Sequence, residues 1–345
     1  WNAFHRREEI VRQETDGVLV LEESDLSRIP VRQKRANKGT YGPLLCIAGS
    51  EGMAGAAYLS ALAAYRSGAG LVRILTPEVN RSILQIQLPE AIVESYDLET
   101  ESLSAENPGE AFLVQQRGGI TVSEEESPKV TERGQHLPLS LSHLEALLAS
   151  CKAVVLGPGL GQSEYAAALV RETLRHCRVP LIADADALNL IARRPSLLAL
   201  RKSPWIFTPH PGEMSRLTEH EIPEILCETR SIAESYRDHY GVTLCLKTDE
   251  SIIADAESGK TYRNESGSPA LAKAGSGDVL SGIIAGLLCL GMKPGEAAAF
   301  GAYLHGRAGQ AAAERYSLHG ILARDIADAV PSVMRAAAFN QLKGR

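Results

Sequence analysis

The chain has 345 residues, of which 44% are hydrophobic and 23% charged, and its formal net charge is −6. This composition is ordinary for a folded globular protein and excludes disorder of the whole chain. The negative balance argues against a general nucleic-acid-binding protein, which usually carries a basic face. No run of about 18 apolar residues occurs, so the sequence predicts no transmembrane helix and no membrane partner.

The first 37 residues mix charges densely, and Ser27–Lys38 holds five basic residues and no acidic one. A solvated linker is the simpler interpretation, and a positive rim for a phosphate-rich ligand is the alternative. The length alone suggests two domains at roughly 150 residues each. Because the motifs described below come from most of the chain, we expect 38–338 to form a single catalytic domain instead. Residues 1–37 would be a charged segment or linker remnant, and 339–345 a tail.

Strands and helices are predicted from apolar runs and from helical spacing. Strands are expected at 44–48, 71–75, 153–156, 181–183, 205–208 and 242–246, and a hairpin at 252–255 and 261–263. Helices are expected at 54–67, 165–176, 185–192, 212–217, 277–290, 294–315 and 323–338. This alternation predicts an α/β sandwich with a mainly parallel sheet.

One stretch breaks the alternation and carries the charge. From Asp97 to Ser140 nine acidic residues face three basic ones, a balance of −6, so the rest of the chain sums to zero. About forty polar residues cannot bury a core by themselves. We therefore expect an acidic insertion at about 97–140, either a loop or a small β flap.

The cysteine pattern favours a reducing compartment. The six cysteines are Cys46, Cys151, Cys177, Cys227, Cys245 and Cys289, and none forms a CxxC pair. A zinc site or a disulfide framework is not predicted. Buried free thiols in a cytoplasmic protein are the simpler interpretation.

The segment Ala274–Asp278 precedes an apolar helix and is the strongest chemical signal. Its glycines, Gly275 and Gly277, leave backbone N–H groups open at a helix N-terminus, which favours a phosphoryl group. Asp278 would lie in the first helical turn, where a carboxylate can accept a hydroxyl proton. The alternative is that Ser276 or Asp278 only caps the helix.

Further candidates follow other predicted strands, at the edge where ligands bind in open α/β sheets. His210 lies between two prolines in Thr208–Glu213 and would contact a ligand, with Glu213 near a metal-bound water; a surface turn is the alternative. Gly157–Gly161 could let a ligand approach bare backbone, or simply form a tight turn. Its spacing is not that of a dinucleotide fingerprint.

Charged side chains follow two more predicted strands. Lys247 could meet a nucleotide phosphate or ribose, although an exposed lysine at a strand end is common. Asp184 and Asp186 follow the strand at 181–183, where helix capping competes with a ligand role.

Together these motifs resemble one family, the nucleotide-dependent NAD(P)H-hydrate dehydratases of the ribokinase-like superfamily. The matching segments are Lys38–Gly42, Ala48–Ser50 with Gly55–Ala57, Gly157–Gly161, Asp184–Leu188, Thr208–Glu213, Leu271–Lys273 with Gly275–Asp278, and Tyr303–Gly306. Each is weak alone, but their combination and order are specific. The resemblance implies a ribokinase-like three-layer α/β/α sandwich in the cytoplasm.

The resemblance also implies an activity, the ADP- or ATP-dependent repair of hydrated NADH and NADPH. Asp278 would deprotonate the hydroxyl of the hydrated ring, and Gly275, Ser276 and Gly277 would hold the terminal phosphoryl with Mg²⁺. Phosphate elimination would then restore NADH or NADPH. The hydrated dinucleotide would touch Ala56, Gly159, His210 and Asp278. The nucleotide would touch Lys247, Thr248, Asp249, Glu250, Ser251 and Gly277. No direct metal ligand is implied, although Glu213 could act through water.

Two other functions share parts of this pattern. A kinase for a vitamin precursor would use the same fold and the same glycine-rich site. A non-catalytic nucleotide-binding protein is disfavoured by Asp278. The resemblance favours ADP over ATP, and it implies a homo-oligomer, typically a tetramer, and an NAD(P)H-hydrate epimerase that acts in the same pathway.

Overall fold

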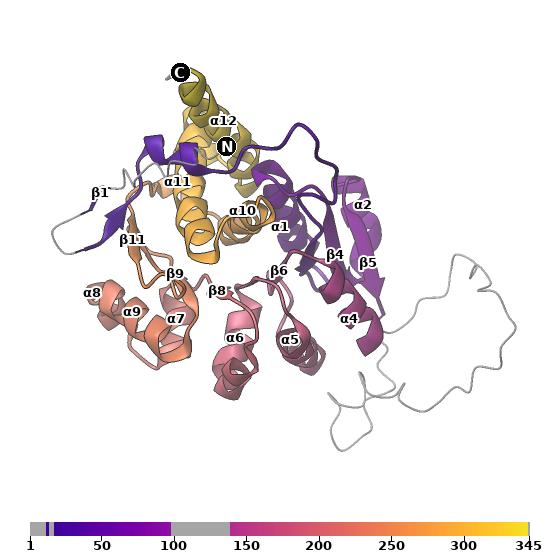
Figure 1. Cartoon of the computed structure of the whole chain (residues 1–345). Helices are drawn as coiled ribbons and strands as arrows, with labels where there is room; N and C mark the ends of the chain where they lie inside the picture. Colours follow the sequence, from indigo (N-terminus) through magenta and orange to yellow (C-terminus); the bar gives the residue numbers. More distant parts are fainter. Residues whose placement is uncertain (1–11, 14–16, 98–138, 344–345) are drawn as a thin grey trace, which may run out of the picture.

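The computed structural model describes residues 12–13, 17–97 and 139–343, and the acidic insertion falls almost entirely outside these ranges. Within them, eleven strands form one sheet (Figure 1). Their bounds are β1 (Arg12–Gln13), β2 (Leu19–Val20), β3 (Leu44–Ile47), β4 (Val72–Pro77), β5 (Ile92–Tyr96), β6 (Ala153–Leu156), β7 (Leu181–Ala183), β8 (Trp205–Phe207), β9 (Thr243–Leu246), β10 (Ser251–Ala254) and β11 (Thr261–Asn264).

The strand order is β1-β2-β11-β10-β9-β8-β7-β6-β3-β4-β5. The seven strands from β5 to β9 in this order are parallel to their neighbours, and β10 and β11 pair antiparallel. The carboxyl ends of the parallel strands therefore meet at one edge, which is where open α/β sheets bind their ligands.

Helices cover both faces of the sheet (Figure 1). One layer consists of α1 (Ala54–Ser67), α10 (Ser276–Cys289), α11 (Pro294–Gly320) and α12 (Ala323–Lys343). The other contains α4 (Leu141–Ser150), α5 (Glu164–His176), α6 (Asp186–Arg193), α7 (Pro211–Thr218), α8 (Ile222–Cys227) and α9 (Thr229–Tyr240), while α2 (Arg81–Gln87) lies beside β5. The predicted three-layer α/β/α sandwich with a mainly parallel sheet is confirmed.

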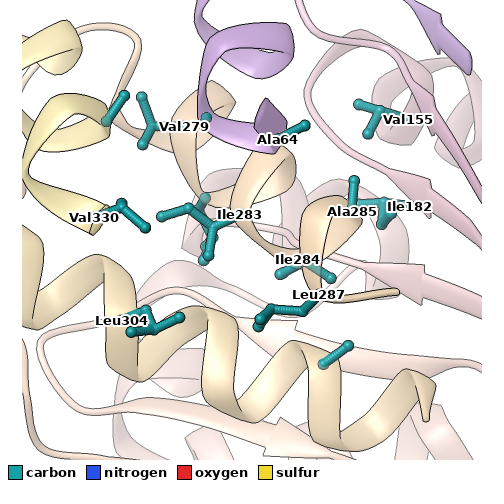
Figure 2. Packing of buried hydrophobic residues seen from close by; sticks show 14 of the residues in the cluster. Ala64, Val155, Ile182, Val279, Ile283, Ile284, Ala285, Leu287, Leu304 and Val330 are labelled. Carbon is teal, nitrogen blue, oxygen red and sulfur yellow. The ribbon is translucent and has the colours of Figure 1, made fainter. Parts of the chain in front are cut away.

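Alternate residues of each strand pack into two separate cores, because successive side chains of a strand point to opposite faces of the sheet. In β6, Val155 faces the α10 side and Val154 faces the α5 side. Figure 2 shows the first core, in which Ile283 of α10 lies among Val330 of α12, Leu304 of α11 and Ala64 of α1. This packing fixes α10 against the middle of the sheet.

Small residues let α10 approach α1 closely. A Cβ atom on Gly282 would collide with the carbonyl oxygen of Ser60 and lie 2.8 Å from Cβ of Ala63. A Cβ atom on Gly286 would likewise collide with the Ser67 hydroxyl. The short distance between these helices sets how the start of α10 lies relative to the start of α1.

The N-terminal segment differs from the linker expected for it. Val18, Leu21, Leu26 and Ile29 are buried, and β2 pairs with β11. These side chains are apolar and join the sandwich, whereas residues 31–39 are exposed. The packed unit thus includes residues before 38, the start that the sequence predicts.

Some elements were absent from the sequence prediction. They include α2, β5, α4, α8 and α9. Helix α11 was predicted, but it extends to Gly320 across a kink at Ser317. Five cysteines are buried as predicted, but Cys227 is exposed, and all six are free thiols. None of the helices in the described ranges combines the length and the apolar character needed to cross a bilayer.

Candidate functional site

The candidate site lies where the carboxyl ends of β7, β8 and β9 face the first turn of α10. Lys247 directly follows β9, and its ammonium lies 3.0 Å from the Oδ1 atom of Asp184, which follows β7. A Cβ atom on Gly277 would lie 3.3 Å from the same ammonium. Residues distant in the sequence, Asp184, Lys247 and Gly277, are thus brought together.

The start of α10 has the geometry of an anion site. Gly275 adopts a φ of 87°, a left-handed conformation that L side chains rarely adopt, and a Cβ atom there would collide with Leu59. The first N–H groups of a helix lack partners within the helix, and the helix dipole adds positive potential. Because Gly277 carries no side chain, an anion can approach these groups from the side of Lys247.

Four carboxylates interact at this helix start, those of Asp184, Asp186, Glu213 and Asp278 itself. Burial raises the pKa of Asp278 to about 7, and the negative charge of Asp184 adds to the rise. Burial also raises the pKa of Glu213, against the opposing effect of Lys247. The pKa of Lys247 is raised as well, because Asp184 and Glu213 outweigh the effect of its burial. Asp278 can therefore gain and lose a proton near neutral pH, whereas Lys247 stays charged.

A cavity of about 630 Å³ opens beside this helix start. Of the residues expected to bind nucleotide, Lys247, Thr248, Asp249, Ser251 and Gly277 line it. The remaining one, Glu250, is exposed and is not among the lining residues; its carboxylate lies 3.7 Å from the guanidinium of Arg263.

His210 lines the same cavity but also has a structural role. Its Nδ1 atom accepts hydrogen bonds from the backbone N–H groups of Gly212, at 3.0 Å, and Glu213, at 3.3 Å. The Glu213 carboxylate in turn accepts from the backbone N–H of His210, which completes a capping box at the start of α7. Burial and the charge of Lys247 lower the pKa of His210, so its ring is neutral near pH 7 with the proton on Nε2.

The glycine loop after β6 lies next to the start of α1. A Cβ atom on Gly159 would lie 2.8 Å from Cβ of Ala56. These two residues, both expected to touch the hydrated dinucleotide, are therefore in contact. The backbone N–H of Gly161 donates to the Oδ2 atom of Asp186 at 2.8 Å.

Two polar residues in the site, Ser281 and His305, were not expected there from the sequence. Ser281 donates a 2.6 Å hydrogen bond to Asp184, and the Ser276 hydroxyl lies 3.0 Å from Nε2 of His305. Burial and the charge of Lys247 lower the pKa of His305 to about 4, so it is neutral. The matching segment Tyr303–Gly306 contained the signal for His305, and helical spacing from Asp278 could have suggested Ser281.

Within the described ranges, no group of three or more His, Cys, Asp or Glu side chains could hold a metal ion. In nucleotide sites Mg²⁺ keeps several waters and binds through one or two carboxylates together with substrate phosphates. The buried carboxylate of Glu213 stands near the cavity and is compatible with that role.

Comparison with known proteins identifies the family of this chain. The family model described as NAD(P)H-hydrate dehydratase matches residues 44–332. The ADP-dependent (S)-NAD(P)H-hydrate dehydratase of Bacillus subtilis is 31% identical over 314 residues, which are 91% of this chain and 96% of that protein. A crystal structure of the Bacillus subtilis ADP/ATP-dependent enzyme, co-crystallised with ATP and Mg²⁺, superposes with a TM-score of 0.70 at 30% identity, and the match covers 92% of this chain and 97% of that one.

Longer relatives match as well. The bifunctional NAD(P)H-hydrate repair enzyme Nnr of Moorella thermoacetica is 37% identical over 309 residues, which are 90% of this chain but 52% of that protein. The chain thus spans about half the length of the bifunctional relatives it matches. Since the family model covers most of the chain, and the Bacillus subtilis relative matches along nearly its whole length, this chain belongs to the NAD(P)H-hydrate dehydratase family.

Proposed function

We propose that this chain removes water from hydrated NADH and NADPH in a reaction driven by an adenine nucleotide. The observation that carries the proposal is the position of Asp278. Its carboxylate, with a pKa near 7, lies in the first turn of α10 beside a glycine-lined anion site. A base with a pKa near the working pH is suited to general base catalysis.

In the proposed reaction, Asp278 accepts the proton of the hydroxyl group on the hydrated nicotinamide ring. The hydroxyl oxygen forms a bond to the terminal phosphorus of the nucleotide, and the bond from that phosphorus to the leaving nucleotide breaks. The N-terminus of α10, with Gly275, Ser276 and Gly277, holds the phosphoryl group. Loss of phosphate and of a neighbouring ring proton then restores the double bond of the dihydronicotinamide.

The two substrates would occupy neighbouring parts of the site. Ala56, Gly159 and His210 would contact the hydrated dinucleotide. The adenine nucleotide would lie in the 630 Å³ cavity, along Lys247, Thr248, Asp249 and Ser251, with Gly277 at its phosphates. When bound, Mg²⁺ would neutralise charge on the phosphates, and Glu213 would hold it through water.

We propose ADP as the preferred nucleotide, since the Bacillus subtilis relative is named as ADP-dependent. The test mixes purified protein with hydrated NADH, Mg²⁺ and either ADP or ATP, and follows the recovery of reduced-nicotinamide absorbance. Recovery with ADP at the higher kcat/KM would support both proposals. No recovery with either nucleotide would exclude the dehydratase, and phosphorylation of a vitamin precursor instead would identify a kinase.

Asp278→Asn is the matching variant. It keeps the volume of the side chain but cannot accept the hydroxyl proton, so turnover should fall by a factor of about 10² to 10⁴. Nucleotide affinity, measured by calorimetry, should change little because the anion site is intact. Retained turnover would show that another group is the base.

The quaternary structure and the domain boundaries are proposals of the same kind. We propose a homo-oligomer, a tetramer by resemblance, built from single catalytic domains. The Ala-rich segment of α11 does not support an interface, because Ala297, Ala298 and Ala299 are buried within the core. Light scattering on the purified chain would give the number of copies.

A further inference from the structure

The turn between β7 and α6 carries two carboxylates on either side of a strained residue. Ala185 adopts a φ of 50° and a ψ of −118°, a conformation that L residues rarely adopt. Asp184 precedes it and Asp186 follows it. The unusual backbone lets the two carboxylates bind different parts of the site.

Asp184 binds the residues at the start of α10, where the phosphates would lie. It is 1% exposed, and its two oxygens have separate partners. Oδ1 accepts from the ammonium of Lys247 at 3.0 Å, and Oδ2 accepts from the hydroxyl of Ser281 at 2.6 Å. Ser281 lies one turn after Gly277 in α10, and its hydroxyl also contacts the Gly277 carbonyl oxygen at 3.2 Å. One carboxylate therefore ties the end of β9 to the first turns of α10.

Asp186 binds the glycine loop after β6 instead. Its Oδ2 atom accepts from the backbone N–H of Gly161 at 2.8 Å, and its Oδ1 atom accepts from the side chain of Gln162 at 3.0 Å. The turn itself packs tightly on this loop, because a Cβ atom on Gly157 would collide with the carbonyl oxygen of Asp184. Asp186 thus offers a charged neighbour that does not contact Lys247.

We infer that Asp184 is a positioning residue, which holds Lys247 at the start of α10 and withholds part of its charge from a bound nucleotide until phosphoryl transfer. The inference rests on the proposed function. A lysine paired at 3.0 Å has a fixed direction and a partly neutralised field, so it contributes little to ground-state binding of phosphate. As charge moves onto the leaving group, the same fixed ammonium stabilises the transition state.

Removal of the Asp184 charge should therefore affect binding and turnover in opposite directions. In Asp184→Asn, Lys247 loses the carboxylate at 3.0 Å and keeps the Glu213 carboxylate at 3.9 Å and the charge of Asp278 as anionic neighbours. The freed ammonium should bind phosphates more tightly, so the Kd of MgADP and of MgATP should fall about three- to ten-fold. A misdirected ammonium should lower kcat about 10- to 100-fold.

The pH profile gives a readout that a merely structural role would not move. Charged or titratable groups face Asp278 from several elements: Asp184 after β7, Asp186 in α6, Glu213 in α7, Lys247 after β9 and Cys46 in β3. Loss of the Asp184 charge and release of Lys247 both lower the pKa of Asp278. The acidic limb of kcat/KM should therefore move about one unit below its wild-type position near pH 7.

Asp186→Asn is the matched control, since it removes a carboxylate from the same turn without touching Lys247. Its Kd for MgADP should stay within about twofold of wild type, because Coulomb attraction between Lys247 and phosphate is unchanged. A double-mutant cycle with Lys247→Met completes the design. If Asp184 acts through Lys247, Asp184→Asn should not tighten MgADP binding in the Lys247→Met background.

The experiment measures MgADP and MgATP binding by calorimetry, and kcat, KM and pH profiles with hydrated NADH, on wild type and variants. Unchanged or weaker nucleotide binding in a folded Asp184→Asn protein would overturn the inference. So would lower kcat with an unmoved acidic limb, which indicates a purely structural role. If Asp184→Asn does not fold, Ser281→Ala decides: a three- to ten-fold loss of kcat at unchanged Tm supports the inference, and unchanged kcat overturns it. A wild type that binds nucleotide but does not dehydrate hydrated NADH contradicts the proposed function instead.

Discussion

Asp278 is unusual because it combines a raised pKa with a place at a helix N-terminus. The helix dipole favours a charged carboxylate there, but burial and the neighbouring Asp184 disfavour it more strongly. The charge of Lys247 opposes this rise in pKa, but its ammonium is already paired with Asp184 at 3.0 Å. The charged form of Asp278 therefore costs free energy in the folded protein.

That cost predicts a pH-dependent stability. The pKa of Asp278 is about 7 in the folded chain and near 3.8 in the unfolded chain. The folded state thus binds the extra proton between these values, and stability is lost as the pH rises from about 4 to 7. Asp278→Asn removes this loss, so above pH 7 the variant should be more stable than wild type by up to about 4 kcal/mol.

Urea unfolding at pH 5 and pH 8 measures this difference. The free energy of unfolding of Asp278→Asn should exceed that of wild type by more at pH 8 than at pH 5. The exposed side chain of Glu51 provides a control, since Glu51→Gln should show no such growth. An equal advantage at both pH values would mean that the folded pKa of Asp278 is not raised.

At the scale of elements, contact between α1 and α10 determines the geometry of the site. Helix α1 carries Ala56 near its start and α10 carries Asp278 near its start. Gly282 and Gly286 bring the two helix backbones close together. Changes in this contact should reach the site without altering any residue that touches a ligand.

Gly282→Ala tests the contact. The added methyl group would meet Ser60 and Ala63, so overpacking should lower the free energy of unfolding by about 1–3 kcal/mol. Gly55→Ala is the matched control, because a Cβ atom on that glycine in α1 meets nothing within 4 Å. The control should be neutral or stabilising by about 0.5–1 kcal/mol in urea unfolding. Equal effects of both variants would show that the helices do not constrain each other.

The helices and strands that were predicted with the right bounds are the ones made of apolar residues. Helix α1 and strands β6 and β7 have the predicted bounds, because each is an apolar run with clear ends. Helix α9 was missed because its sequence, TRSIAESYRDHY, is mostly polar and buries only a narrow stripe that includes Ile232 and Tyr236. Strand β5 was missed because it runs directly into the acidic stretch that begins at Asp97, so no glycine or proline marks where the strand ends.

The site was predictable only one motif at a time. The sequence identified Lys247, Gly277 and Asp278 as candidates, since Lys247 follows a recognisable strand and the other two begin an apolar helix. It could not show that Asp184 joins Lys247 to Ser281, because that contact depends on the order of strands in the sheet. Strand order results from packing over the whole chain and leaves no local pattern.

At the scale of the molecule, the N-terminal segment closes one end of the sandwich. Leu26 is 3% exposed and packs in the core with α11 and α12. Arg28 pairs with Glu296 at 2.6 Å and its guanidinium lies 5.2 Å from the ring centre of Phe300. These contacts hold residues outside the expected domain onto its core.

Leu26→Ala should therefore destabilise the whole protein. A buried leucine truncated to alanine costs about 2–5 kcal/mol. Val31→Ala is the control, because Val31 is 72% exposed and its truncation should change stability by less than about 0.5 kcal/mol. Thermal unfolding of the two variants gives the comparison, and a neutral Leu26→Ala would restore the linker interpretation.

The pairing of β2 with β11 also has a consequence for how the protein is made. Leu19 lies opposite Tyr262, so β2 cannot find its partner until the ribosome has made the chain as far as β11. The ion pair between Arg28 and Glu296 forms later still. Until then the apolar side chains of residues 18–29 stay exposed to solvent. Transiently exposed apolar surface is what chaperones bind, so we expect a chaperone to hold the nascent chain at this segment.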